Sequence, residues 1–94
     1  MSDLITTYSK DEFFKLLDNE GIEKCFNDFI PNDNINVIGE DDFDSDWLLD
    51  LSKQGCYIDN TYGDKHVKVY FDKKIDGYLF VITFKDKTYI VFGI

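Results

Sequence analysis

The sequence predicts an α+β fold, in which two or three N-terminal helices pack on a C-terminal antiparallel sheet, a meander of three to four strands. Two observations predict this class. Apolar residues recur every three or four positions in the first half of the chain, and the period changes to two after residue 56. Ninety-four residues, 44% of them hydrophobic and 17% aromatic, are enough for one modest core, so we expect a single domain over residues 1–94.

The first helix is predicted to begin at a capping box. The Ser9 hydroxyl is placed to accept a hydrogen bond from the Glu12 amide, while Glu12 reaches back to the Ser9 amide. Gly21 is expected to end this helix before a second short helix, which Pro31 closes. The apolar stripes of the two helices comprise Phe13, Leu16, Leu17, Cys25, Phe26 and Phe29.

A third helix is predicted over residues 46–53, with Ser45 as its N-cap and Gly55 just past its end. Before it, residues 35–38 alternate only weakly, which fits either a short strand or an extended lead into the acidic residues that follow. The apolar face of the third helix comprises Trp47, Leu48 and Leu51, so we expect Trp47 in the core.

The C-terminal meander is read from alternation and turn residues. Residues 67–71 alternate apolar and polar, which predicts a strand with one buried face. Residues 78–84 are apolar at nearly every position, which predicts a central strand covered on both faces. Turns at Asp76-Gly77 and Asp86-Lys87 join these strands to a last strand over residues 88–94, which we expect to be built into the sheet.

Negative charge is concentrated in one part of the chain. Residues 25–52 contain eight carboxylates and no lysine or arginine, and thus supply −8 of the net charge of −9. Residues 1–24 carry six acids and three lysines, and residues 53–94 carry five acids and seven lysines. Carboxylates this close repel one another unless salt screens them or a cationic partner relieves them. All ten basic residues are lysines, so no guanidinium is available to read phosphates or guanine edges, and we expect no direct nucleic-acid binding.

We expect no specific metal site in this acidic part. Asp42, Asp44 and Asp46 have the spacing that begins a calcium loop. Counted from Asp42, however, the sixth residue is Trp47 rather than the glycine of the sharp turn, and the twelfth is Lys53 rather than a bidentate glutamate.

Catalytic and cofactor motifs are equally weak. His66 has no nucleophile or orienting carboxylate beside it in the sequence, so we expect a partly exposed strand residue. Cys25 and Cys56 lack zinc or redox spacing and are expected to be reduced and mostly buried. No glycine-rich phosphate loop is present. We therefore expect a protein that is not an enzyme and uses no cofactor. The N-terminus lacks signal-peptide features and no apolar run could span a membrane, which predicts a cytoplasmic location.

The segment Glu40-Asp41-Asp42-Phe43-Asp44-Ser45-Asp46-Trp47 beside an α+β body resembles the immunity proteins that neutralise bacterial nuclease toxins of the contact-dependent-inhibition and colicin type. The resemblance implies a non-catalytic inhibitor whose carboxylates cover the basic groove of a nuclease, speed association and exclude the nucleic acid. For Phe43, two interpretations stay open: an exposed anchor that contacts the partner, or a core residue. The residues expected to bind the basic partner are Glu40, Asp41, Asp42, Phe43, Asp44, Asp46 and Asp50.

Three alternatives compete with the immunity protein. A phage-encoded nucleic-acid mimic of the anti-restriction or anti-CRISPR type would use the carboxylates in place of a phosphate track, but it would spread them along the molecule, whereas residues 53–94 are net +2. A solvated acidic loop that only keeps the protein soluble is the simplest alternative. A small catalytic or ligand-binding domain is the third, because distant residues can converge in a fold.

Overall fold

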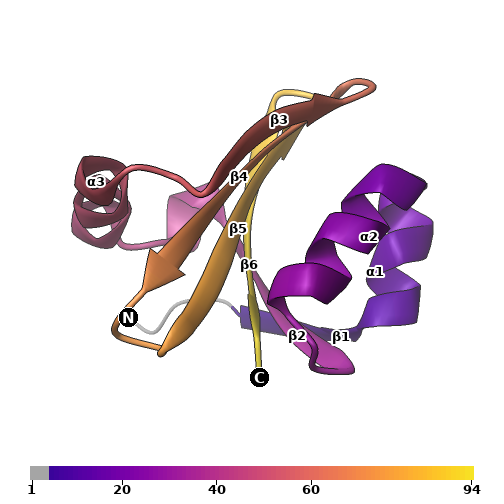
Figure 1. The fold of residues 1–94 in the computed structure, drawn as a ribbon, viewed down its shortest axis with the longest axis horizontal. Helices are drawn as coiled ribbons and strands as arrows, with labels where there is room; N and C mark the ends of the chain where they lie inside the picture. The colour runs from indigo at the N-terminus through magenta and orange to yellow at the C-terminus, as the bar shows by residue number, and fades with distance from the viewer. Residues whose placement is uncertain (1–4) are drawn as a thin grey trace.

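Residues 5–94 are described by a computed structural model. Six antiparallel strands form one sheet in the order β1-β2-β6-β5-β4-β3. The helices α1 and α2 cover one face of the sheet, and α3 lies against the other (Figure 1). The strands are β1 (Ile5–Ser9), β2 (Asn34–Gly39), β3 (Ile58–Tyr62), β4 (Lys65–Asp72), β5 (Gly77–Phe84) and β6 (Lys87–Gly93). The helices are α1 (Lys10–Leu17), α2 (Glu20–Phe29), α3 (Ser45–Gln54) and a 3-10 turn, η1 (Glu40–Asp42).

The α+β class is confirmed, with the helices preceding the C-terminal strands, but the predicted number of strands is too low. β3 to β6 form an antiparallel meander of four strands, to which β2 and then β1 are added beside β6. The weak alternation of β2 has a physical cause. Ile35 and Val37 are buried under α1 and α2, while Ile38 is buried on the α3 side, so each face of this strand carries at least one buried apolar residue.

The helix caps combine predicted and unpredicted contacts. As expected, the Glu12 amide donates to the Ser9 hydroxyl, at 3.2 Å. That hydroxyl in turn donates to the Glu12 carboxylate at 2.9 Å, instead of Glu12 reaching the Ser9 amide. α3 begins one residue earlier than predicted, because Asp44 rather than Ser45 is its N-cap and accepts from the Asp46 amide at 2.9 Å.

The prediction that Gly21 ends the first helix is wrong. Asp18, in the left-handed conformation with φ 49°, ends α1, and Asn19 caps α2, so Gly21 lies in the first turn of α2. A Cβ atom at Gly21 would lie 2.8 Å from the ring of Tyr62, so the glycine lets α2 approach β3 closely. The end of α2 just before Pro31 is as predicted.

Two hydrophobic clusters, one on each face, hold the layers together. Under α1 and α2, the Phe26 ring packs on Phe80 with 4.3 Å between centroids. On the α3 side, Leu51 and Leu79 are buried in a smaller cluster. β5 contributes to both clusters, which confirms that it is a central strand covered on both faces. Across residues 5–94, no helix is long and apolar enough to cross a membrane.

Candidate partner-binding surface

Residues 40–50 form a short turn and a helix on one side of the sheet, and we call them the acidic segment. η1 carries three of its carboxylates, Asp44 caps α3, and the other two lie on α3 itself. Five of the six side chains are exposed and Asp42 is half-buried. The carboxylates of the acidic segment are Glu40, Asp41, Asp42, Asp44, Asp46 and Asp50.

The charge of the acidic segment is not neutralised within the part of the chain that the structure describes. The two ion pairs there join Lys65 to Asp64 at 2.9 Å and His66 to Asp59, and neither includes a carboxylate of the segment. Six unpaired carboxylates on a short stretch produce a strong local negative field, which attracts cations over roughly a Debye length of 8 to 10 Å.

Two of these carboxylates also stabilise the helix that carries them. Asp44 satisfies an amide in the first turn of α3, and Asp46 lies in the same turn, where the partial positive charge of the helix N-terminus favours an anion. Asp44 and Asp46 are therefore held at defined positions rather than on a freely moving loop.

A groove of about 370 Å³ lies where η1 meets the β5–β6 turn. Glu40, Asp41 and Asp42 line it from one side, and Asp86 and Lys87 line it from the turn. The pairing of β2 with β6 brings these groups together, because Gly39, just before η1, lies opposite Tyr89. Sequence reasoning missed Asp86, since the only signal for it is the strand register. The Asp86 carboxylate, from a distant part of the chain, thus lines the same groove as three carboxylates of the acidic segment.

The interpretation of Phe43 as an exposed anchor is wrong. Its side chain is only 8% exposed and stacks on Trp47, with 4.7 Å between ring centroids and 21° between planes. Both residues pack in the cluster under α3 together with Leu51, so the chain turns Phe43 inward although Asp42 and Asp44 flank it. Trp47 is half-buried at the margin of this cluster, with the Lys74 ammonium 5.2 Å from its ring centre. Phe43 and Trp47 therefore fix η1 and α3 on the sheet.

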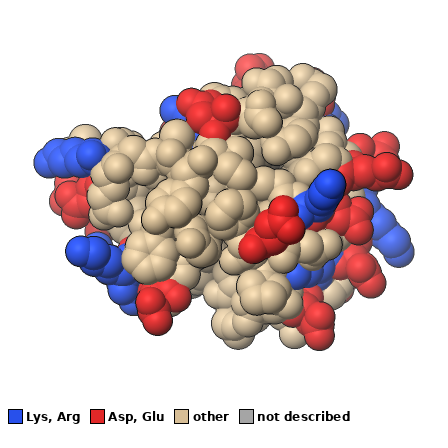
Figure 2. Space-filling view, viewed as in Figure 1, with Lys and Arg blue, Asp and Glu red and all other residues tan. Residues whose placement is uncertain are grey.

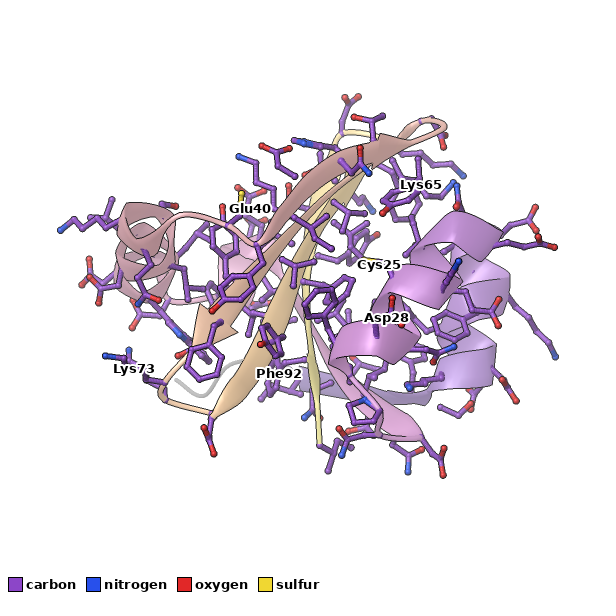
Figure 3. All side chains as sticks on the ribbon, viewed as in Figure 1. Cys25, Asp28, Glu40, Lys65, Lys73 and Phe92 are labelled. Atoms are coloured by element: carbon purple, nitrogen blue, oxygen red, sulfur yellow. The ribbon has the colours of Figure 1, made fainter. Side chains whose placement is uncertain are left out.

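The other two carboxylates of residues 25–52 lie outside the acidic segment. Asp28 is on α2 and Asp33 follows that helix, so the sheet separates Asp28 from the acidic segment. Figure 3 shows Glu40 on the α3 side and Asp28 on the α2 side. On the face seen in Figure 2, acidic and basic groups lie mainly around the margin, and a broad uncharged area occupies the middle.

The possible catalytic groups lie outside this surface. His66 Nε2 bonds the Asp59 carboxylate across β3 and β4, an orienting contact that the sequence did not reveal because it depends on strand pairing. The two side chains are 43% and 52% exposed, so water solvates the pair. Among residues 5–94, no group of three or more His, Cys, Asp or Glu side chains is arranged to hold a metal ion.

The two cysteines differ in environment. Both thiols are free. Cys25 is buried as predicted, whereas Cys56 is exposed in the connection from α3 to β3, so the prediction is wrong for Cys56. Burial raises the pKa of the Cys25 thiol, the hydrogen bond with Tyr62 opposes this shift, and the negative charge of Asp28 adds to it. Cys25 is therefore a protonated core residue at neutral pH rather than a nucleophile.

Searches against models of protein families, curated proteins and solved structures find no match for this chain. The functional conclusion therefore depends on the residues and geometry described above.

Proposed function

We propose that the protein is a non-catalytic acidic inhibitor that binds and neutralises a basic nucleic-acid-processing protein, as the immunity proteins of nuclease toxins do, in the bacterial cytoplasm. The single observation that carries this proposal is the acidic segment, in which six of eleven residues are carboxylates and none forms an ion pair with another residue of the described range 5–94. A basic partner relieves the repulsion among these groups, so binding and charge neutralisation favour each other.

The proposed mechanism requires no covalent chemistry. The negative field of the acidic segment orients the approaching partner, which raises association rates toward about 10⁸ M⁻¹s⁻¹ at low salt. In the proposed complex, η1 and α3 occupy the groove of the partner that the nucleic acid would use. Because Phe43 and Trp47 hold these elements against the sheet, little ordering entropy is lost on binding. The negative field of the acidic segment raises the rate of association, and the fixed backbone of the segment favours high affinity.

A nucleic-acid mimic remains the alternative function, and the number of carboxylates favours it less. The Cα trace spans 31 Å along its longest axis, about the length of one turn of B-DNA, and such a turn carries roughly twenty phosphates. Six carboxylates on one turn and one helix imitate only a small part of such a track. A local plug in a protein groove fits the arrangement better.

Affinity capture from the bacterial lysate at about 0.05 M salt, where screening is weak, tests the proposal. The bait is the wild-type protein, and the matched control is a variant with Asp41, Asp42, Asp44 and Asp46 replaced by Asn, which keeps side-chain size and the α3 cap. We expect the wild type, and not the variant, to retain a basic protein whose nuclease activity falls when wild-type protein is added. Equal capture by both baits, or a captured protein that is not inhibited, would contradict the proposal.

A further inference from the structure

Four aromatic side chains meet on the molecular surface beside α2, and we call them the aromatic cluster. Tyr78 of β5 is its centre. The ring centroids lie 4.9 Å from Phe29 of α2, 5.4 Å from Tyr57 and 5.5 Å from Phe71 of β4, with 68° to 76° between the planes of each pair. Tyr57 is 63% exposed and the other three are half-buried, so the cluster is open to solvent. Sequence reasoning missed it because its members come from four separate parts of the chain.

Three of these rings line a groove of about 400 Å³, which is distinct from the groove at η1. Phe29, Phe71 and Tyr78 form aromatic walls, Ile75 extends them, and Asp76 supplies a carboxylate. Among the residues that the structure describes, no lysine lines the groove, although Lys73 and Lys74 lie in the same β4–β5 turn as Asp76. Figure 2 shows a broad uncharged area on the face in view, and Figure 3 shows Asp28 on α2 and Lys73 at the β4–β5 turn.

We propose that this groove binds an arginine or lysine side chain of a basic protein partner. Aromatic ring faces attract a cation that lies within about 6 Å of the ring centre, and rings set nearly at right angles to Tyr78 present both faces and edges to one guest. The Asp76 carboxylate pairs with the positive head, while the aliphatic stem contacts Ile75. The groove thus combines the apolar and anionic contacts that a long cationic side chain requires.

Charge decides between a basic partner and a second copy of this chain. Each copy has a net charge of −9, so self-association through this groove would bring two strongly negative molecules together. A basic protein carries the opposite charge and is therefore attracted rather than repelled. The proposal relies on the proposed function only for the positive charge of the partner, because the groove shares no residue with the acidic segment.

Titration of the ¹⁵N-labelled full chain with N-acetyl-arginine amide, followed by NMR, tests this proposal. The matched probe is N-acetyl-citrulline amide, which has nearly the same shape but no charge. We expect the signals of Phe29, Phe71 and Tyr78 to shift at least about twofold more with the arginine probe than with the citrulline probe, because the cation–π and carboxylate contacts require charge. Equal shifts with both probes, or arginine shifts confined to Glu40 and Asp41, would overturn the proposal.

A pair of turn variants separates a specific contact from general attraction. Asp76 and Asp18 are both exposed turn residues with a positive φ of 49°, and each substitution to Asn removes one negative charge. We expect Asp76→Asn to weaken the binding of the arginine probe by about two- to fivefold, and Asp18→Asn to leave it unchanged. Equal weakening by both variants would show non-specific attraction and overturn the proposal.

Two further measurements complete the test. Sedimentation of the free protein checks its oligomeric state, and a dimer that Tyr57→Ser dissociates would identify a second copy as the occupant and overturn the proposal. The same NMR titration of the quadruple Asn variant of the acidic segment should keep the arginine shifts at Tyr78. That result distinguishes the groove from the proposed function, which is tested separately by the capture and inhibition experiment.

Discussion

Replacing Phe43 with Ala should strongly destabilise the protein. The side chain is 8% exposed, so truncation removes most of its buried surface and leaves a cavity under η1. Large-to-small substitutions of buried phenylalanine cost about 3 to 5 kcal/mol, and loss of the stack on Trp47 contributes about 0.5 to 1.5 kcal/mol of such a cost. Because the cluster under α3 is small and close to the surface, partial collapse of the site should keep the loss near the lower end, about 3 kcal/mol.

Urea unfolding followed by circular dichroism measures this effect. With a slope of about 1 to 1.5 kcal/mol per molar urea, a loss of about 3 kcal/mol lowers the unfolding midpoint by about 2 to 3 M. Leu49→Ala is the matched control, because Leu49 lies on α3 only a few residues away but is 55% exposed. We expect that control to change the free energy of unfolding by less than about 0.5 kcal/mol.

A loss below about 1 kcal/mol for Phe43→Ala would refute the core position of Phe43, since surface substitutions have effects of that size. The acidic segment would then be free of the sheet, and the interpretation of Phe43 as an exposed anchor would return. Phe43→Leu, which retains apolar volume but not the aromatic stack, separates packing from ring contact. We expect it to lose less than half as much stability as Phe43→Ala.

Three further predictions concern charge, reactivity and geometry. Raising salt from about 0.02 to 0.5 M shortens the Debye length from roughly 20 to 4 Å and screens the repulsion among the unpaired carboxylates of the acidic segment, so the melting temperature should rise. An unchanged or lower melting temperature would mean that the fold disperses this repulsion. Iodoacetamide should modify Cys56 in the native protein and Cys25 only after unfolding, as mass spectrometry of the intact protein would show, and rapid double labelling would disprove the burial of Cys25. Gly21→Ala should cost about 1 to 2 kcal/mol in urea unfolding because its Cβ would meet the Tyr62 ring at 2.8 Å, and an unchanged midpoint would show that this ring moves away freely.

Alkaline pH should also destabilise the protein, with Cys25 and Tyr62 as the groups responsible. Burial is the main reason why the pKa of each is raised, above 9.0 for the thiol and above 10.0 for the phenol, and their mutual hydrogen bond raises that of Tyr62 further. Because the native state keeps these protons while the unfolded chain loses them, this stabilisation is complete below about pH 9 and declines as the pH rises further. Urea midpoints between pH 7 and 11 measure the decline, and Cys25→Ala should reduce it; an identical decline in that variant would exclude the thiol as a cause.

The sequence was sufficient for several features that depend on neighbours along the chain, although it misplaced the Ser45 cap and the helix end at Gly21. The Ser9 cap, the end of α2 before Pro31 and the turn at Asp76 each involve groups only a few residues apart, so composition and spacing identify them. β2 could not be assigned in the same way. Its apolar side chains are buried partly under α1 and α2 and partly on the α3 side, and only the tertiary arrangement reveals that covering.

The candidate partner-binding surface was likewise predictable from the sequence only in part. Exposure of the carboxylates at positions 41, 44, 46 and 50 agrees with what charge alone predicts, since isolated carboxylates remain in water. The burial of Phe43 was ambiguous because the flanking aspartates indicate that the backbone is near the surface but not the direction in which the Phe43 side chain points. Asp86 and the aromatic cluster were out of reach, because strand register and the packing of α2 bring those residues together.

Phe43 and the carboxylates around it act in opposite directions on stability. Two carboxylates about 8 Å apart in water repel by roughly 0.5 kcal/mol, so a few neighbouring pairs cost about 2 kcal/mol before salt screening. Burial of Phe43 contributes about 3 kcal/mol at the same place, which is enough to hold η1 and α3 in position despite that repulsion. The strain that remains is electrostatic and reversible, and the cationic partner that we propose would remove it on binding. A fixed backbone bearing uncompensated charge is therefore stable when free and more stable when bound, which is the condition that a fast, tight inhibitor requires.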